Sequence, residues 1–74
     1  MLDRIFFLHS KINKNECVRI VTTVKGWEIH IDRTDIIKSD DDMLTIFRPS
    51  GTITVINPNE IAVACTMKKE NRFL

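Results

Sequence analysis

The chain has 74 residues, of which 28% are charged, and its formal net charge is +1. This length allows one domain with a marginal core, because chains of about 60 residues bury only about 60% of the surface that their unfolded form exposes. Such a weak net charge gives no strong overall field to attract nucleic acid. The charge is uneven, however: residues 1–26 sum to +3, residues 27–43 to −4 and residues 44–74 to +2. This asymmetry favours electrostatic contact between copies of the chain, and salt would screen that attraction.

The first predicted element is a short helix over residues 2–12. Apolar side chains recur there at offsets of three and four, and Asp3 lies near the start, where the helix dipole favours an acid. A strand through Ile5–His9 is the alternative, because adjacent phenylalanines are well tolerated in strands. Residues 13–15 are predicted to connect this segment to the β core, since asparagine accepts turn geometry.

Two strands joined by a glycine turn are predicted next. Cys17–Val24 is rich in β-branched residues, and Gly26 can take the positive φ that a turn requires. Trp27, Ile29 and Ile31 then alternate with polar residues, so the hairpin is expected to have one buried and one wet face, with Trp27 in the core.

The middle of the chain predicts three further strand-like segments. A corner at 32–34 leads to a short strand over 35–38, and a turn at 39–42 leads to a strand over 43–48 with Leu44 and Ile46 inward. Pro49-Ser50-Gly51 is typical of a turn. Residues 52–56 return beside the preceding strand, with Ile53 and Val55 expected as the buried pair.

The last segment has two interpretations. Asn57, Pro58 and Glu60 have the pattern of a helix start, but residues 61–67 alternate as in a strand. We predict a single 3₁₀ turn followed by a closing strand, with a C-terminal helix as the alternative. Residues 68–74 are expected to form a polar, frayed tail. Taken together, these patterns predict one domain over residues 1–74. It consists of a helix and connector (1–15), a β core (16–67) and the tail (68–74).

The predicted fold class is mainly β. Five or six short antiparallel strands would roll into a small, partly open barrel, with the N-terminal helix beside it. Gly26 and Ile31 recur as Gly51 and Ile56 at a distance of 25 residues, which indicates two similar glycine-cornered hairpins.

Cysteine usage and hydropathy bear on the compartment. Cys17 and Cys65 lie in apolar runs, which is typical of buried reduced thiols, although a bridge between neighbouring strands is the alternative. The apolar stretch Ile5–Leu8 is too short for a signal sequence or a membrane span. We therefore expect a cytoplasmic protein that does not act at a membrane.

No cofactor, metal site or catalytic residue is predicted. Asp40–Asp42 lacks the glycine and the distant glutamate of a calcium loop, so a solvated turn is expected. Neither cysteine has a visible activating neighbour in the sequence. An enzyme that pairs Cys17 or Cys65 with His30 is the minor alternative to a non-enzymatic protein.

Two kinds of binding surface remain. Nucleic-acid contact would use basic groups beside stacking surfaces, and the candidates are Arg19, Trp27, Arg33, Phe47 and Arg48. Protein contact is better supported, because several apolar residues fall on strand faces opposite the predicted core. These interaction candidates are Val21, Ile37, Phe47 and Ile56. A symmetric homo-oligomer is the commonest way to cover such a surface.

The layout resembles the Sm/Hfq-like small barrels. A helix over 2–12 is followed by Val18–Val24, the Lys25-Gly26 turn and several short strands. This resemblance implies single-stranded RNA binding, but the chain departs from the family in two ways. No second glycine precedes Asp32, and Asn57-Pro58-Asn59-Glu60 replaces the basic or histidine-bearing closing motif.

A second resemblance is to the short FlbD-like flagellar accessory proteins. It rests on Val24-Lys25-Gly26, Ile31-Asp32-Arg33-Thr34-Asp35-Ile36, Leu44-Thr45-Ile46, Ser50-Gly51 and Val55. These are turn and core residues, and the segment through Asn15 has no counterpart in that family. The resemblance implies a non-enzymatic helper that works by protein contact. The sequence therefore predicts an accessory or regulatory module that binds protein and forms homo-oligomers, with RNA binding as the alternative.

Overall fold

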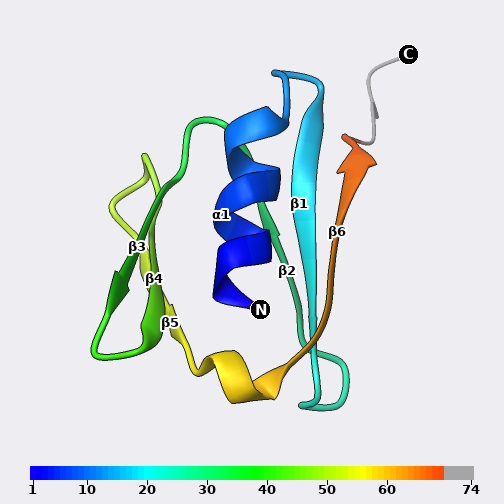
Figure 1. The fold of residues 1–74 in the computed structure, drawn as a ribbon. Helices are drawn as coiled ribbons and strands as arrows, with labels where there is room; N and C mark the ends of the chain where they lie inside the picture. The colour runs from blue at the N-terminus through cyan, green and yellow to red at the C-terminus, as the bar shows by residue number, and fades with distance from the viewer. Residues whose placement is uncertain (70–74) are drawn as a thin grey trace.

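A computed structural model describes residues 1–69 as one helix, six strands and a 3₁₀ turn. In chain order these are α1 (Leu2–Lys11), β1 (Glu16–Thr22), β2 (Glu28–Ile31), β3 (Ile36–Asp40), β4 (Met43–Phe47), β5 (Ile53–Ile56), η1 (Pro58–Glu60) and β6 (Ile61–Lys68). Figure 1 shows two groups of strands, with α1 in front of the space between them. The strands confirm the prediction of a mainly β fold.

The helix α1 confirms the prediction for residues 2–12. Asp3 occupies its first turn, and Ile5 is fully buried against the strands. Ile12 adopts an extended conformation and ends the helix, while its N–H donates to the carbonyl oxygen of Leu8 at 3.2 Å. The helix contacts β1 and β6, and Arg4 Nε donates to the carbonyl oxygen of Ala64 at 3.0 Å. Among the described residues, no helix is long and apolar enough to cross a membrane.

The first sheet has the antiparallel strand order β2-β1-β6. Val18 lies opposite Ile31 and Ile20 opposite Ile29, so these four apolar side chains share the inner face. The turn between β1 and β2 contains Gly26 at φ +79°, a conformation that suits glycine. On the other side of β1 the ladder with β6 shifts register between Val21 and Thr22, which is a β-bulge.

The second sheet has the antiparallel order β3-β4-β5. The turn between β3 and β4 places both Asp41 and Asp42 at positive φ, as a tight hairpin turn requires. Leu44 lies opposite Ile56, and both side chains are buried on the inner face. The β4–β5 turn ends at Gly51, which has φ +93°. This confirms the turn predicted at 49–51. The turn predicted at 39–42 is shorter than expected, because Ser39 and Asp40 belong to β3 and pair with β4.

The connection from β5 to β6 confirms the prediction of a 3₁₀ turn and a closing strand. Asn57 accepts a hydrogen bond from the backbone N–H of Asn59 at 3.0 Å, and Pro58 occupies the first turn. The turn is short because residues from Ile61 onward pair with β1. The C-terminal helix that was the alternative for this segment is therefore wrong.

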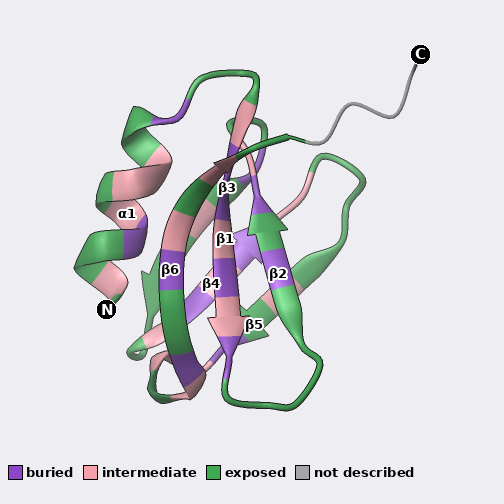
Figure 2. Ribbon diagram, turned by 90° about the vertical axis from the view of Figure 1, so that its right-hand side faces the viewer, coloured by how far each residue is buried: buried purple, intermediate pink, exposed green. Residues whose placement is uncertain are grey.

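One core joins both sheets and the helix. Its fully buried large side chains are Ile5, Val18, Ile20, Ile31, Leu44, Ile46 and Ile56. Figure 2 views the first sheet with β1 between β6 and β2, and the buried bands alternate along β1 as its pleat requires. The described strand pairs lie within each three-stranded sheet, so the structure gives no closed barrel. Of the predicted tail, residues 70–74 lie outside the described residues.

Several predictions of side-chain position are wrong. Trp27 precedes β2 and is 37% exposed, so it is not a core residue. Ile53 and Val55 were expected inward but are 59% and 52% exposed, whereas Ile56 is 1% exposed. The register with β4 explains the reversal, because Ile56 lies opposite the buried Leu44. Ile37 likewise packs against the core rather than facing outward.

Candidate interaction surfaces

The outer face of the second sheet carries an apolar row. Register places Ile36 opposite Phe47, and Phe47 opposite Ile53, so one side chain from each strand lies in line. Ile36 and Ile53 are more than half exposed, and Phe47 is half-buried. Val55, also exposed, lies one row further along β5. We call Ile36, Phe47, Ile53 and Val55 the apolar row.

The side chain of Lys38 lies over one member of the apolar row, Phe47. Its Nζ lies 5.7 Å from the centroid of the Phe47 ring, within the range of a cation–π interaction. Phe47 faces outward as predicted, but one face of its ring is therefore already occupied. This contact reduces its use as a platform for stacking a nucleotide base.

The four outer strands of the two sheets differ in charge. Among the described residues, β2, β6, β3 and β5 each pair with a neighbour on one side only. The edge strand β2 carries Glu28 and His30, and the edge strand β3 carries Lys38 and Asp40. Charged side chains on an edge strand discourage pairing with a further strand. By contrast, β5 has no charged residue, and β6 has none before Lys68. We call β5 and β6 the open edges because they lack these charges, although α1 contacts β6 and Arg4 occupies one of its carbonyl oxygens, that of Ala64.

Exposed apolar side chains lie on both open edges. On β5 they are Ile53 and Val55, and on β6 Val63 is 48% exposed. Edge strands with unpaired backbone groups and apolar side chains are templates for pairing with another chain. Sequence reasoning missed Ile53, Val55 and Val63 because it placed them on the wrong face or gave them no role. The available signal was the absence of charge from residues 53–56 and 61–67.

The outer face of the first sheet is polar on β2 and sulfur-bearing on β6. Arg19 lies opposite His30 on one side and opposite Cys65 on the other. Glu28 pairs with Arg19, and His30 Nε2 lies 3.2 Å from Glu28 Oε1. The Arg19 hydrogen bond holds the pKa of Glu28 below its usual range.

The positions of His30, Arg19 and Cys65 across the first sheet argue against the minor alternative of a cysteine–histidine enzyme. The two strand spacings between His30 and Cys65 amount to about 10 Å, and Arg19 lies between them. Such a separation exceeds the reach of the hydrogen bond that activates a nucleophile. Cys17, also on this face, is buried, and burial raises the pKa of its thiol.

A corner cavity of about 660 Å³ lies where β6 ends near the β2–β3 corner and the β4–β5 turn. Two ion pairs cross its wall. Arg48 Nη1 lies 3.1 Å from Asp35 Oδ2, and Lys69 Nζ lies 2.9 Å from Asp32 Oδ2. The hydrogen bond from Thr34 is the main cause that lowers the pKa of Asp32 to about 2, and Lys69 adds to it. The two cations at this cavity therefore already have carboxylate partners.

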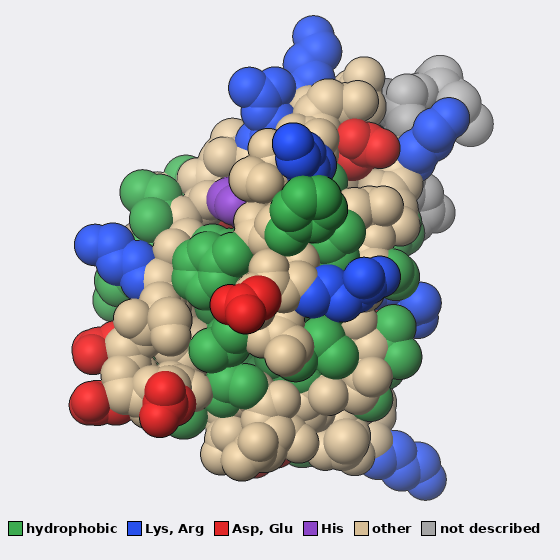
Figure 3. All heavy atoms as spheres, in the orientation of Figure 1, with side chains coloured by type: hydrophobic (Ala, Val, Ile, Leu, Met, Phe, Trp, Pro, Cys, Tyr) green, Lys and Arg blue, Asp and Glu red, His purple; other side chains and the backbone are tan. Residues whose placement is uncertain are grey.

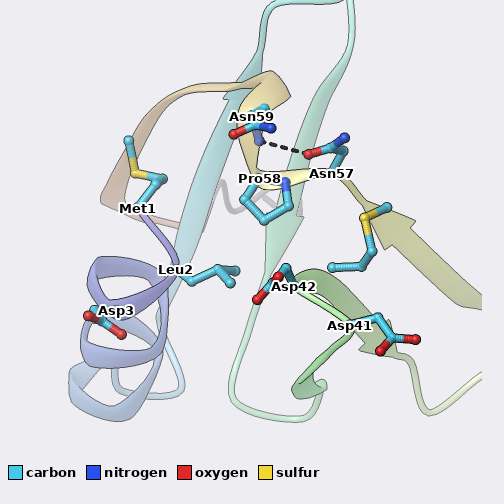
Figure 4. A pocket seen from close by; sticks show the side chains of 9 residues that line it. Met1, Leu2, Asp3, Asp41, Asp42, Asn57, Pro58 and Asn59 are labelled. Carbon is cyan, nitrogen blue, oxygen red and sulfur yellow. Dashed lines mark hydrogen bonds between the residues drawn. The ribbon is translucent and has the colours of Figure 1, made fainter.

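A second cavity, of about 560 Å³, lies at the start of α1 (Figure 4). It is lined by Met1, Leu2, Asp3, Asp41, Asp42, Met43, Asn57, Pro58 and Asn59. In Figure 3 acidic side chains gather over the β3–β4 turn on the same side of the molecule. An acidic lining repels phosphate, so this cavity does not suit a nucleic-acid backbone. In the described part of the chain no three His, Cys, Asp or Glu side chains form a metal-binding group.

The residues predicted to contact nucleic acid are not gathered in one basic surface. Arg19 is paired with Glu28 on the first sheet, whereas Arg48 is paired with Asp35 at the corner cavity. Trp27 lies in the β1–β2 turn and Arg33 at the β2–β3 corner. Of the predicted protein-contact residues, Val21 and Phe47 lie on outer faces, and Ile37 and Ile56 belong to or pack against the core.

Comparison of the chain with protein-family models, with curated proteins and with solved structures finds no match.

Proposed function

We propose that the protein is a non-enzymatic accessory or regulatory module that acts by protein binding, and that it assembles with copies of itself through the open edges β5 and β6. The observation that carries this proposal is the contrast between the four outer strands. Those with charged side chains, β2 and β3, are protected, whereas β5 and β6 pair on one side only and present apolar side chains, although Arg4 on α1 already occupies the carbonyl oxygen of Ala64 on β6.

The apolar row supports the same proposal. Ile53 and Val55 belong both to the row and to the β5 edge, so a strand that pairs with β5 also covers part of the row. A domain of this size has a marginal core, and burial of apolar area between copies stabilises it at about 25 cal/mol per Å². Self-association therefore adds stability that one copy lacks.

The proposal includes the finer fold and the compartment. We take the two sheets as halves of one partly open barrel, because only residues 32–35 separate β2 from β3 and both sheets share one core. We also place the protein in the cytoplasm, since Cys17 and Cys65 are both free thiols and free thiols suit a reducing compartment. Single-stranded RNA binding has less support, because the basic side chains Arg19 and Arg48 are already paired.

Sedimentation equilibrium of three lysine variants tests the proposal. Wild type is expected to sediment as a multiple of the 8.6 kDa chain. Val55→Lys and Val63→Lys place a charge on the two open edges and are expected to give monomers. Phe7→Lys is the matched control, because Phe7 is 60% exposed and belongs to α1 rather than to either edge strand. A wild-type monomer at high concentration, or edge variants that assemble like the control, would refute it.

A further inference from the structure

The outer face of the first sheet also carries three sulfur side chains, one on β1 and two on β6. Cys17 lies directly opposite Met67 in the β1–β6 ladder, and Cys65 precedes Met67 by two residues. Successive side chains of a strand point to opposite faces, so Cys65 and Met67 share a face with Cys17. The fully buried Val18 and Ile20 alternate with Cys17 and mark the other face as the inner one.

These spacings are short enough for one ion to bridge the sulfurs. Side chains directly opposite in an antiparallel pair have Cβ atoms about 4.5–5.5 Å apart, and diagonal neighbours about 7–8 Å or less. Cys17 and Met67 are the direct pair, and Cys17 and Cys65 the diagonal one. Methionine has three rotatable bonds, so its thioether can move toward an ion held by the two thiols.

The donor set determines which ion fits. Thiolate and thioether sulfurs are soft ligands that select Cu(I) over harder cations. A structural zinc site takes four ligands, and within residues 1–69 no group of three His, Cys, Asp or Glu side chains is placed to supply them. A soft monovalent cation with two thiolates and a thioether needs no fourth ligand.

Burial and charge also favour such an ion. Cys17 is 4% exposed, and Cys65 and Met67 are half-buried, so an ion between them is shielded on the sheet side. Two thiolates and one monovalent cation have a net charge of −1. Arg19 lies opposite Cys65, and Lys69 lines the same corner cavity as Cys17 and Met67. Both cations also have carboxylate partners, Glu28 and Asp32, so they offset that charge only in part.

We propose that Cys17, Cys65 and Met67 bind one soft monovalent cation of the Cu(I) class. Both thiols lose their protons to solvent as the ion binds, and no sulfur changes oxidation state. Cys65 and Met67 lie on β6, one of the two proposed assembly edges, but their side chains point from the outer face of the sheet and not along the backbone edge that another strand would pair with.

The test is an anaerobic titration of the reduced full-length chain with Cu(I) in competition with a chromogenic Cu(I) chelator. Native mass spectrometry gives the stoichiometry, and one ion per chain is expected. Cys65→Ser should weaken binding by about a hundredfold or more, since even loss of outer-shell partners costs 10–100-fold. Met67→Leu keeps both thiols and should weaken it by about tenfold. Met43→Leu is the matched control, because Met43 lies on β4 in the other sheet.

Two results would overturn the site. The first is two ions per chain, which would show that the thiols bind separately. The second is Met67→Leu with the affinity of the Met43→Leu control, which would remove the thioether from the site. Folding of each variant is checked by circular dichroism, and Met67→Leu preserves the volume of a half-buried position. Val55→Lys, in which assembly is expected to fail, should bind Cu(I) like wild type, so the two proposals can fail separately.

Discussion

The ion pair between Asp35 and Arg48 is expected to stabilise the fold more than any exposed pair. Asp35 is 5% exposed, and its Oδ2 accepts from Arg48 Nη1 at 3.1 Å and from the backbone N–H of Asp32 at 2.8 Å. Arg48 Nη1 also donates to the carbonyl oxygen of His30 at 3.1 Å. These contacts connect the end of β2, the β2–β3 corner and the end of β4.

Replacing Asp35 by alanine removes the acceptor for two donors. Loss of one partner of a buried ion pair costs about 3–5 kcal/mol. Arg48 has a side chain 28% exposed and can turn toward water, so the cost is expected to fall at or below the lower end of that range. We expect the free energy of unfolding to fall by about 2–3 kcal/mol, which for a domain of this size lowers the melting temperature by about 10–20 °C.

Urea denaturation at pH 7 and fixed protein concentration measures this change, because stability of an assembling protein depends on concentration. Asp40→Asn is the matched control, since Asp40 is an exposed acid on β3 and its loss should change stability by less than about 0.5 kcal/mol. A double-mutant cycle with Arg48→Met should give a coupling energy of about 1–2 kcal/mol. The reasoning fails if Asp35→Ala costs no more than Asp40→Asn, or if the coupling energy is near zero.

Two further predictions concern a titrating carboxylate and the face of β5. The pKa of Asp32 is lowered to about 2 in the folded chain and is about 3.9 in unfolded chains, so its charge stabilises the fold above pH 4 and this contribution is lost as pH falls toward 2. Urea midpoints of wild type should therefore fall over this pH range more steeply than those of Asp32→Asn, and parallel curves would contradict the role of Asp32. Ile56→Ala should lower the free energy of unfolding by about 2–4 kcal/mol because Ile56 is fully buried, whereas Ile53→Ala should cost less than about 1 kcal/mol in a monomeric background such as Val55→Lys. Equal losses in thermal melts of the two variants would contradict the observed facing of β5.

The helix and the strands could be predicted because the spacing of their apolar residues is typical of each kind of element. In residues 2–12 apolar side chains recur at offsets of three and four, and the segment around Ile20 is rich in β-branched residues, so each forms the element that its pattern favours. The capping side chain of Asn57 and the ring of Pro58 likewise mark η1. Such local signals act through near neighbours in the sequence.

Which side chains of a strand point toward the core was harder to predict where the strand has apolar residues on both faces. In β5, Ile53 and Val55 are as apolar as Ile56, so the period alone does not say which side is inward. Pairing with β4 decides it, because only one register brings Ile56 opposite Leu44. Ile37 was placed outward for the same reason. Trp27 closes the β1–β2 turn, where its N–H donates to the carbonyl oxygen of Val24 at 3.0 Å, and this holds it out of the core.

The contacts that form the candidate surfaces depend on pairing between distant segments. Asp35 and Arg48 are 13 residues apart, and Cys17 and Cys65 are 48 apart. Nothing in the sequence around either residue of a pair indicates its partner. The sulfur cluster appears only after the β1–β6 register is known, because a shift of one residue would turn Cys65 and Met67 to the inner face.

The geometry of the two open edges also constrains the proposed assembly. β5 and β6 belong to different sheets and are joined by η1, so one copy presents its two open edges at separate places. If β5 of one copy pairs with β6 of the next, the contact is heterologous, and repetition gives either a closed ring or an open fibre. A ring leaves no open edge, whereas a fibre always has two. A single finite species of wild type in sedimentation velocity would therefore support a ring. Val55→Lys and Val63→Lys each keep one edge intact, so a mixture of the two variants would form a mixed dimer and no larger assembly.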